Sequence, residues 1–455
     1  MRIRRVTTAG LAVALVVGGM TMVVVNAQAA ITPVPSVGVQ LPVQDFRAIE
    51  LDEDRGRLYV AQGVGGGLPL VVTDLDGRLE TRVDAVTDVS DVALSDDGNT
   101  LYGAQGFDRI VALDAQSLTV RATYPAPDGA CVYDAQPTGD KVVGSYVNCG
   151  IGSGGLLVWS APDTAPVVYT QGPNYHPVVD ASPGAPGLLV AGDTEISPVT
   201  TYVIDVSGDS PRIVAHRDDT GSNLEDYAVS PDGTEVVESV GNPYEHRSYR
   251  LPDLADDTVY PSGVYPADAA WSGDGSTVAI GRSQTYSFDA DVLLYAKDST
   301  TPTYAVDFRD GDVLWDGTLL VNRAGTRAWA VSYDDVYQDT ALLHSFGPAH
   351  APNPPVTQLG VTASTGSGKS KQTANITVTW KSPISGNQST QGYYWWITAS
   401  TNGATEKEIW RGNMDATGQY SLTYALPKGT TTFTVRFHDN EGWYPDGYAT
   451  TTVSR

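Results

Sequence analysis

The sequence is poor in cysteine, in basic residues and in catalytic signatures. Only 2 cysteines and 6 histidines occur among 455 residues, and the histidines share no metal-ligand spacing. No H-E-x-x-H, G-x-S-x-G or P-loop pattern is present. Lysine and arginine number 28 against 53 acidic residues, a net charge of −25, which argues against the cationic footprint of a nucleic-acid binder. The sequence therefore indicates no catalytic residue, no resident metal and no nucleic-acid partner.

Turn-forming residues, in contrast, are abundant. The chain contains 47 glycines and 28 prolines, and charged residues make up only 18% of it. This composition favours turn-rich β-structure over helix. The length exceeds that of one ordinary domain but suits one large all-β unit with a small partner domain.

The N-terminus has the layout of a secretory signal. A short cationic stretch at 1–5 precedes an apolar stretch at 10–25, and Ala-Gln-Ala at 27–29 has the pattern of a cleavage site. A retained membrane anchor is the alternative, but the apolar stretch is short and no second one follows. We therefore expect residues 1–29 to be removed from a secreted, extracellular protein without a membrane span. Since no cysteine stands directly after the predicted cleavage site, attachment of a lipid as in lipoproteins is excluded.

In an oxidising compartment the two cysteines are expected to pair. Cys131 and Cys149 are 18 positions apart, and closing a loop of that size stabilises a fold by about 3 kcal/mol. Two buried free thiols are the alternative. The pair is nearly symmetric about Asp140, a turn residue of the repeat described next, so we expect a structural bridge across the open end of a hairpin.

An internal repeat organises the first three quarters of the chain. Residues 91–105 read DVALSDDGNTLYGAQ, residues 226–240 read DYAVSPDGTEVVESV, and residues 268–282 read DAAWSGDGSTVAIGR. Each is an apolar strand, a turn opened by serine and closed by glycine, and a second strand. Weaker copies occupy 48–62, 132–146, 178–192 and 318–332. The seven turns recur with a mean spacing of 45 residues, a period typical of a β-propeller with four strands per blade.

This pattern resembles the YVTN/YncE-type seven-bladed propellers, which are related to WD40-like sheets. The resemblance covers roughly residues 37–347 and implies a fold, because related propellers have many activities. The seventh copy lacks an obvious outer strand, and residues 37–43 precede the first copy. We therefore expect the N-terminal segment to complete the last blade and close the ring.

A second domain is predicted after a proline-rich linker at 348–358. Residues 359–455 alternate as several short strands, which is typical of an Ig-like β-sandwich. The segments DATGQYSLTY at 415–424 and TTFTVRF at 431–437 make this region similar to the bacterial Ig-like modules of secreted actinomycete proteins. That resemblance implies a spacer or adhesive unit.

The best candidate site is the rim of the propeller. The start of each innermost strand and the loop between the second and third strands lie at the same end of a blade, so their polar residues share one surface. A ligand is expected to contact aromatic, basic and acidic side chains there. The rim residues are Asp91, Asp226, Asp268, Arg109, Tyr244, His246, Arg282, Tyr286, Tyr333 and Asp335.

Three functions fit these observations. The first is a non-catalytic recognition protein whose propeller rim binds an extracellular protein or glycan, with the Ig-like domain as spacer or attachment module. The second is an extracellular hydrolase or lyase, lactonase-like, acting at the mouth of the central channel. The third is calcium-dependent binding at the acidic mouth, since a strongly negative surface attracts cations.

Overall fold

The computed structural model describes residues 31–150, 152–194, 196–283, 290–308, 312–334, 340–350, 360–365, 372–380, 393–413, 418–439 and 447–455. Strands dominate these residues and no α-helix occurs among them, which confirms the all-β class. In the same ranges, no helix is long and apolar enough to cross a membrane. The predicted signal at 1–29 and residues 351–358 of the predicted linker lie outside the described residues.

The repeated turn forms for a local reason. In the second copy the Ser95 hydroxyl accepts the backbone N–H of Thr100 at 3.0 Å, and the Ser95 carbonyl accepts the N–H of Gly98 at 2.7 Å. Gly98 has φ +66°, a conformation that glycine adopts without steric cost. The turns opened by Ser230 and Ser272 repeat this arrangement. The serine and glycine therefore fix the tight connection between the first two strands of each blade.

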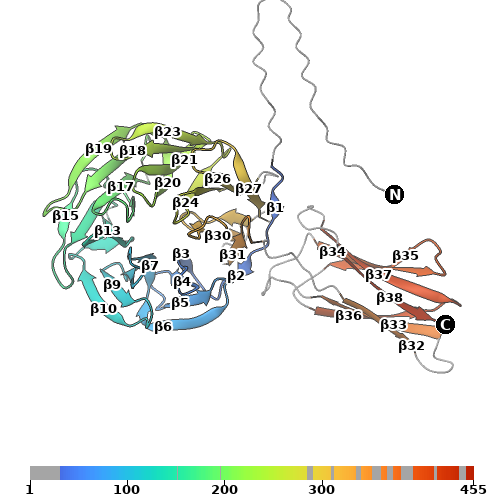
Figure 1. The fold of residues 1–455 in the computed structure, drawn as a ribbon. Helices are drawn as coiled ribbons and strands as arrows, with labels where there is room; N and C mark the ends of the chain where they lie inside the picture. The colour runs from blue at the N-terminus through green and yellow to red at the C-terminus, as the bar shows by residue number, and fades with distance from the viewer. Residues whose placement is uncertain are drawn as a thin grey trace, which may run out of the picture.

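Seven sheets of four or five strands follow one another between residues 34 and 346 and form the blades of a ring (Figure 1). Successive strands of a blade pair antiparallel from the innermost strand to the outermost. The first blade consists of β3 (Phe46–Asp52), β4 (Arg57–Gln62), β5 (Pro69–Asp74) and β6 (Leu79–Thr87). The second consists of β7 (Val89–Leu94), β8 (Thr100–Gln105), β9 (Arg109–Asp114) and β10 (Val120–Pro125). The third is β11 (Ala130–Val132), β12 (Gln136–Thr138), β13 (Lys141–Asn148), β14 (Gly154–Trp159) and β15 (Val167–Tyr169).

The remaining blades continue in chain order. The fourth consists of β16 (Pro177–Ala181), β17 (Leu188–Asp193), β18 (Thr200–Asp205) and β19 (Arg212–Asp218). The fifth consists of β20 (Ser222–Val229), β21 (Glu235–Asn242), β22 (His246–Arg250) and β23 (Ala255–Tyr260). The sixth is β24 (Pro266–Trp271), β25 (Thr277–Arg282), β26 (Val292–Ala296) and β27 (Pro302–Asp307). The seventh is β28 (Asp312–Leu314), β29 (Leu320–Val321), β30 (Ala328–Asp334) and β31 (Ala341–Phe346).

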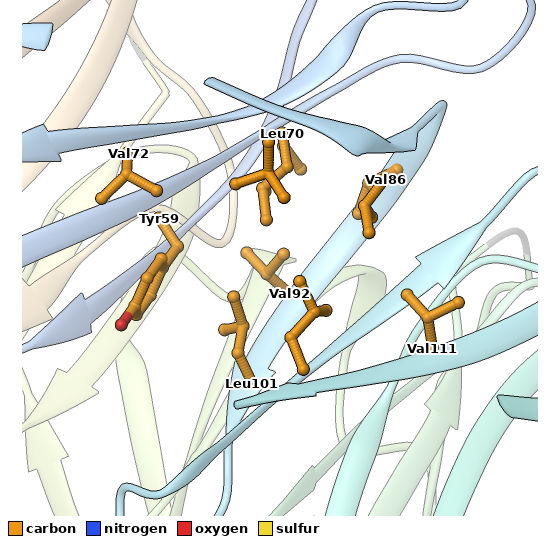
Figure 2. Close-up of a cluster of buried hydrophobic side chains, with 11 residues drawn as sticks. Tyr59, Leu70, Val72, Val86, Val92, Leu101 and Val111 are labelled. Atoms are coloured by element: carbon orange, nitrogen blue, oxygen red, sulfur yellow. The ribbon is translucent and has the colours of Figure 1, made fainter. Parts of the chain in front are cut away.

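Neighbouring blades are held together by their apolar faces. The alternation of side chains along each strand sends every second residue toward the next blade. Each large aliphatic side chain buried in this way contributes roughly 1.5–3 kcal/mol. Figure 2 shows the cluster between the first two blades, with Tyr59, Leu70, Val72 and Val86 from the first and Val92, Leu101 and Val111 from the second.

The N-terminal segment closes the ring, as predicted. Strand β2 (Val39–Gln40) pairs antiparallel with β31 and becomes the outer strand of the seventh blade. A second contact was not predicted: β1 (Val34–Pro35) pairs parallel with β27 of the sixth blade. The segment thus covers the outer edges of two blades, which leaves fewer unpaired backbone groups there.

The predicted disulfide is confirmed. Cys131 on β11 and Cys149 after β13 are bonded, with their Cα atoms 5.3 Å apart. β11 and β12 both pair with β13 as one interrupted inner strand, so the bridge joins the open end of that hairpin.

The C-terminal residues form two further sheets. One has the order β32 (Gly360–Thr365), β33 (Thr373–Trp380), β36 (Gly418–Ala425), and the other has the order β35 (Lys407–Asn413), β34 (Tyr393–Thr401), β37 (Thr430–Asp439), β38 (Gly447–Ser454). Ile376, Val378, Ile397, Phe433 and Val435 from both sheets are fully buried in one cluster. Val37 of the N-terminal segment belongs to the same cluster.

Candidate binding cavity

Six of the seven blades each contribute at least one carboxyl side chain to a cavity on the axis of the ring. The cavity has a volume of about 620 Å³, and residues from all seven blades line it. Most of the carboxyl groups lie on the innermost strands, and one follows β11. We call these six residues the carboxyl ring: Glu50, Asp91, Asp134, Asp180, Asp226 and Asp268.

The carboxyl ring follows from two positions of the repeat. Asp91, Asp226 and Asp268 are the first residue of their copies, whereas Glu50, Asp134 and Asp180 are the third. Positions one and three of a β-strand face the same side. Blades with either pattern therefore direct their acidic side chain toward the axis. The sequence predicted the first three residues as site residues but not Glu50, Asp134 and Asp180. These three could have been found from the weaker copies, in which the acidic residue is shifted by two positions.

Most of the carboxyl ring also joins one blade to the next. Each of these carboxylates accepts backbone N–H groups from the following blade, so it satisfies donors that would otherwise be unpaired in the interior. Asp134 differs, since it accepts the hydroxyl of Ser145 within its own blade at 2.9 Å. The blade-to-blade bonds are Leu94 to Glu50 (3.4 Å), Ala135 to Asp91 (2.9 Å), Val229 to Asp180 (2.6 Å), Ala269 to Asp226 (3.1 Å), and Thr318 and Leu319 to Asp268 (2.6 and 2.8 Å).

Burial makes ionisation of the carboxyl ring unfavourable. It raises the pKa of Glu50 and of Asp134 to about 8, with the negative charge of Asp91 adding to the effect on Asp134. Burial likewise raises the pKa of Asp180 and of Asp268 to about 7. Near neutral pH the ring therefore holds protons that a positively charged ligand would displace.

The cavity is acidic beyond the ring itself. Asp96 also lines it, and Arg323 is the single basic residue among the described residues of its lining. The guanidinium group of Arg323 is paired with Asp54 at 3.1 Å, and its backbone N–H donates to Glu53 at 2.6 Å. The lining is therefore rich in carboxyl groups, and the basic side chain of Arg323 is already paired.

The cavity lies toward a different end of the blades from the predicted rim. Besides the carboxyl ring, its lining includes residues of the turns between the first and second strands, such as Pro183, Pro231 and Gly273. The prediction grouped Asp91, Asp226 and Asp268 with the loops between the second and third strands instead. The three aspartates thus line a cavity together, but the other lining residues come from the turns.

Two of the predicted rim residues are interior. His246 is fully buried, with Nδ1 2.9 Å from the Ser262 hydroxyl and Nε2 3.1 Å from the carbonyl oxygen of Asp268. Arg282 is 3% exposed and donates to the carbonyl of Ala290. Both side chains pack where the sixth blade meets its neighbours. Neither is therefore available to a ligand at the surface, which corrects the prediction.

The other rim residues do not form one group with the aspartates. Arg109 is exposed and pairs with its neighbour Asp108, and Tyr244 is exposed against Tyr265. Tyr333 is half-buried against Trp315, with ring centroids 5.2 Å apart. The last two predicted residues, Tyr286 and Asp335, lie outside the described residues.

Comparison with known proteins identifies the fold. No protein-family model matches the sequence, and no curated protein does. Among solved structures, the chain is similar to the β-propeller domain of Cps50 (Swd1) from Myceliophteria thermophila, with 11% identity, a TM-score of 0.52, and coverage of 68% of this chain and 98% of that domain. Hsv2 from Kluyveromyces lactis matches with 10% identity, a TM-score of 0.48, and coverage of 72% of this chain and 96% of that one. The ring of blades is a β-propeller.

Proposed function

We propose that this protein is a secreted, non-catalytic binding protein, and that the cavity with the carboxyl ring receives a basic segment of an extracellular protein. The observation that carries the proposal is the convergence of six carboxyl groups from six blades on one cavity. A glycan was the other partner predicted from the sequence. An acidic, buried lining favours lysine or arginine side chains over a neutral sugar.

The energetics of the cavity support a cationic ligand. Burial raises the pKa of Asp180 and of Asp268 to about 7 although backbone N–H groups donate to both, so their charged forms are only partly compensated. An incoming guanidinium or ammonium group supplies that compensation and favours ionisation. The net charge of −25 would also steer a basic partner toward the molecule.

The N-terminal and C-terminal parts of the chain are the basis for proposing secretion and a spacer or attachment role. The signal pattern at 1–29 is the basis for secretion, and the disulfide between Cys131 and Cys149 suits an oxidising compartment. The two C-terminal sheets, of three and four strands, are compatible with an Ig-like sandwich. We propose that this sandwich acts as a spacer or attachment module for the propeller.

A peptide-binding measurement tests the proposed function. Fluorescently labelled oligo-arginine and oligo-lysine peptides serve as probes, with an oligo-glutamate peptide of the same length for comparison. The basic peptides should bind, with an affinity that falls as salt concentration rises. The double variant D226N/D268N should bind about tenfold more weakly or worse, as expected when buried charge pairing is lost.

A charge-matched variant separates the cavity from general electrostatics. Asp84 and Asp209 are exposed residues that are not among the residues lining the cavity, so D84N/D209N replaces the same number of carboxyl groups elsewhere. It should bind the basic peptides as the unaltered protein does. Equal losses in the two double variants, or no binding of either basic peptide, would refute the proposed function.

A further inference from the structure

Three carboxylates from two neighbouring blades meet away from the carboxyl ring. Glu235 begins β21 and Asp257 lies on β23 of the fifth blade, whereas Asp298 follows β26 of the sixth. One carboxylate oxygen of each lies within 4.8 Å of those of the other two. Glu235 is buried and the two aspartates are exposed, so the group has an interior end and a solvent-facing end.

A buried hydroxyl without a partner lies beside this group. Tyr260 is fully buried, and its hydroxyl has no hydrogen bond of normal geometry, although the backbone of Asp298 lies close enough to lower its pKa. Burial raises the pKa of that hydroxyl, the charge of Glu235 raises it further, the backbone of Asp298 lowers it, and the charges of Asp298 and Asp257 raise it again. The hydroxyl is therefore close to all three carboxylates.

Glu235 has an unpaired atom as well. Its side chain is 2% exposed, and its Oε1 atom is buried without a hydrogen-bond partner. Two buried oxygen atoms, one from Glu235 and one from Tyr260, thus lack a donor or a cation. Folded proteins rarely leave such atoms unsatisfied, so a ligand at this point is expected.

The one nearby cation does not meet this need. Lys297 Nζ lies 3.5 Å from Glu235 Oε2 and 3.7 Å from Asp232, and it sits 5.5 Å from the ring centroid of Trp271. It therefore supplies one positive charge for four carboxylates and leaves Glu235 Oε1 without a partner. Burial raises the pKa of Glu235, and the charges of Asp257 and Asp298 raise it further, although a hydrogen bond with Ser248 and the charge of Lys297 lower it.

We propose that Glu235, Asp257 and Asp298 bind a calcium ion, with the Tyr260 hydroxyl as a further oxygen beside it. The donors are all oxygen atoms, which suits a hard cation and not zinc, since zinc sites use cysteine and histidine. Calcium takes six to eight oxygens, so water completes the shell on the solvent side, where the two aspartates are exposed. The ion would fasten the fifth blade to the sixth. This site is separate from the acidic mouth considered in the sequence analysis.

Calcium titration of the full chain tests the site. The protein is first treated with EDTA and then titrated with CaCl2 in a calorimeter, and its melting temperature is recorded with and without calcium. One calcium ion should bind, and melting should shift upward because the ligand binds only the folded state. The absence of both heat and melting shift would overturn the proposal, as would tighter binding of magnesium than of calcium.

Variants locate the ion. E235Q keeps the shape of the buried side chain and should weaken calcium binding about tenfold or more, because a charged ligand is lost. K297Q removes the competing cation and should bind calcium more tightly, so it serves if E235Q folds poorly. D226N, in the carboxyl ring, should titrate as the unaltered protein does and separates this site from the peptide-binding cavity. Unchanged binding by both E235Q and K297Q would refute the assignment.

Discussion

The hydroxyl of Ser36 lies 3.0 Å from Nδ1 of His344, although 308 positions separate the two residues, and both are buried. His344 also contacts the Ser332 hydroxyl through Nε2 at 2.8 Å and stacks on Phe308 with ring centroids 3.8 Å apart. The imidazole thus connects the N-terminal segment to the interior of the last two blades. Ring closure rests on this contact as well as on the pairing of β2 with β31.

Replacing Ser36 tests this closure. S36A removes the hydroxyl that lies against Nδ1 of His344, and with the loss of this buried hydrogen bond the free energy of unfolding should fall by about 1–3 kcal/mol. Urea denaturation measures the loss. S210A removes a hydroxyl from an exposed loop position and should change stability by less than about 0.5 kcal/mol. A similar small effect in S36A would show that the N-terminal segment does not stabilise the ring.

The fold could be predicted because its signals are local. Ser95 and Gly98 form their turn through contacts within five residues, and the same letters recur at a regular spacing. The pairing of β2 with β31 also followed, because the last repeat lacked a strand. The pairing of β1 with β27 is a parallel contact of two residue pairs on the outer edge of the sixth blade, for which the sequence carries no periodic signal.

The site was predicted less well because burial is not local. Asp226 and Asp268 occupy a repeat position that faces the axis, and their approach could be inferred from alignment alone. His246 and Arg282 are polar residues next to loops, where exposure is the usual expectation. They are buried because the fifth and sixth blades pack over them, and this packing depends on residues far apart in the chain. Glu50 and Asp180 were missed because their copies shift the acid by two residues.

Stability should fall as pH rises through the neutral range. Burial raises the pKa of Glu50 and Asp134 to about 8 and of Asp180 and Asp268 to about 7. In this range the folded protein holds more protons than the unfolded chain, whose carboxyls are ionised, so raising the pH disfavours the folded state. Urea unfolding at about pH 6.5 and about pH 8.5 should give a lower free energy of unfolding at the higher value.

One variant checks the origin of this pH dependence. In D180N the group no longer titrates, while an amide oxygen remains to accept the N–H of Val229 that Asp180 accepts at 2.6 Å. The free energy of unfolding of D180N should therefore fall less steeply with rising pH than that of the unaltered protein. The two slopes should differ by at most about 1.4 kcal/mol per pH unit, which is the slope for one titrating proton. A pH dependence equal to that of the unaltered protein would show that Asp180 is ionised in both states.

Loss of the disulfide should destabilise the propeller. Cys131 and Cys149 close a loop of 18 residues, and the double variant C131A/C149A should lose about 3 kcal/mol in the free energy of unfolding. The same loss should follow when the unaltered protein is unfolded under reducing conditions. The reductant should not change the unfolding of the double variant, which provides the control. Equal stability of the oxidised and reduced protein would contradict a stabilising role.

His246 should act in stability and not in binding. Its Nε2 faces the carbonyl oxygen of Asp268 at 3.1 Å, which can only accept, so Nε2 carries the proton and Nδ1 accepts from the Ser262 hydroxyl. This neutral form agrees with burial, which lowers the pKa of His246 to about 3. H246A leaves a cavity and an unpaired carbonyl, and the free energy of unfolding should fall by about 2–4 kcal/mol.

The binding of the basic peptides gives the decisive comparison for His246. It is measured at a temperature where H246A remains folded, as judged by its circular dichroism. The affinity should equal that of the unaltered protein, because the carboxylate of Asp268 is held by Thr318 and Leu319. If H246A instead kept the stability of the unaltered protein but lost peptide binding, His246 would be a ligand-contacting residue, as the rim prediction stated.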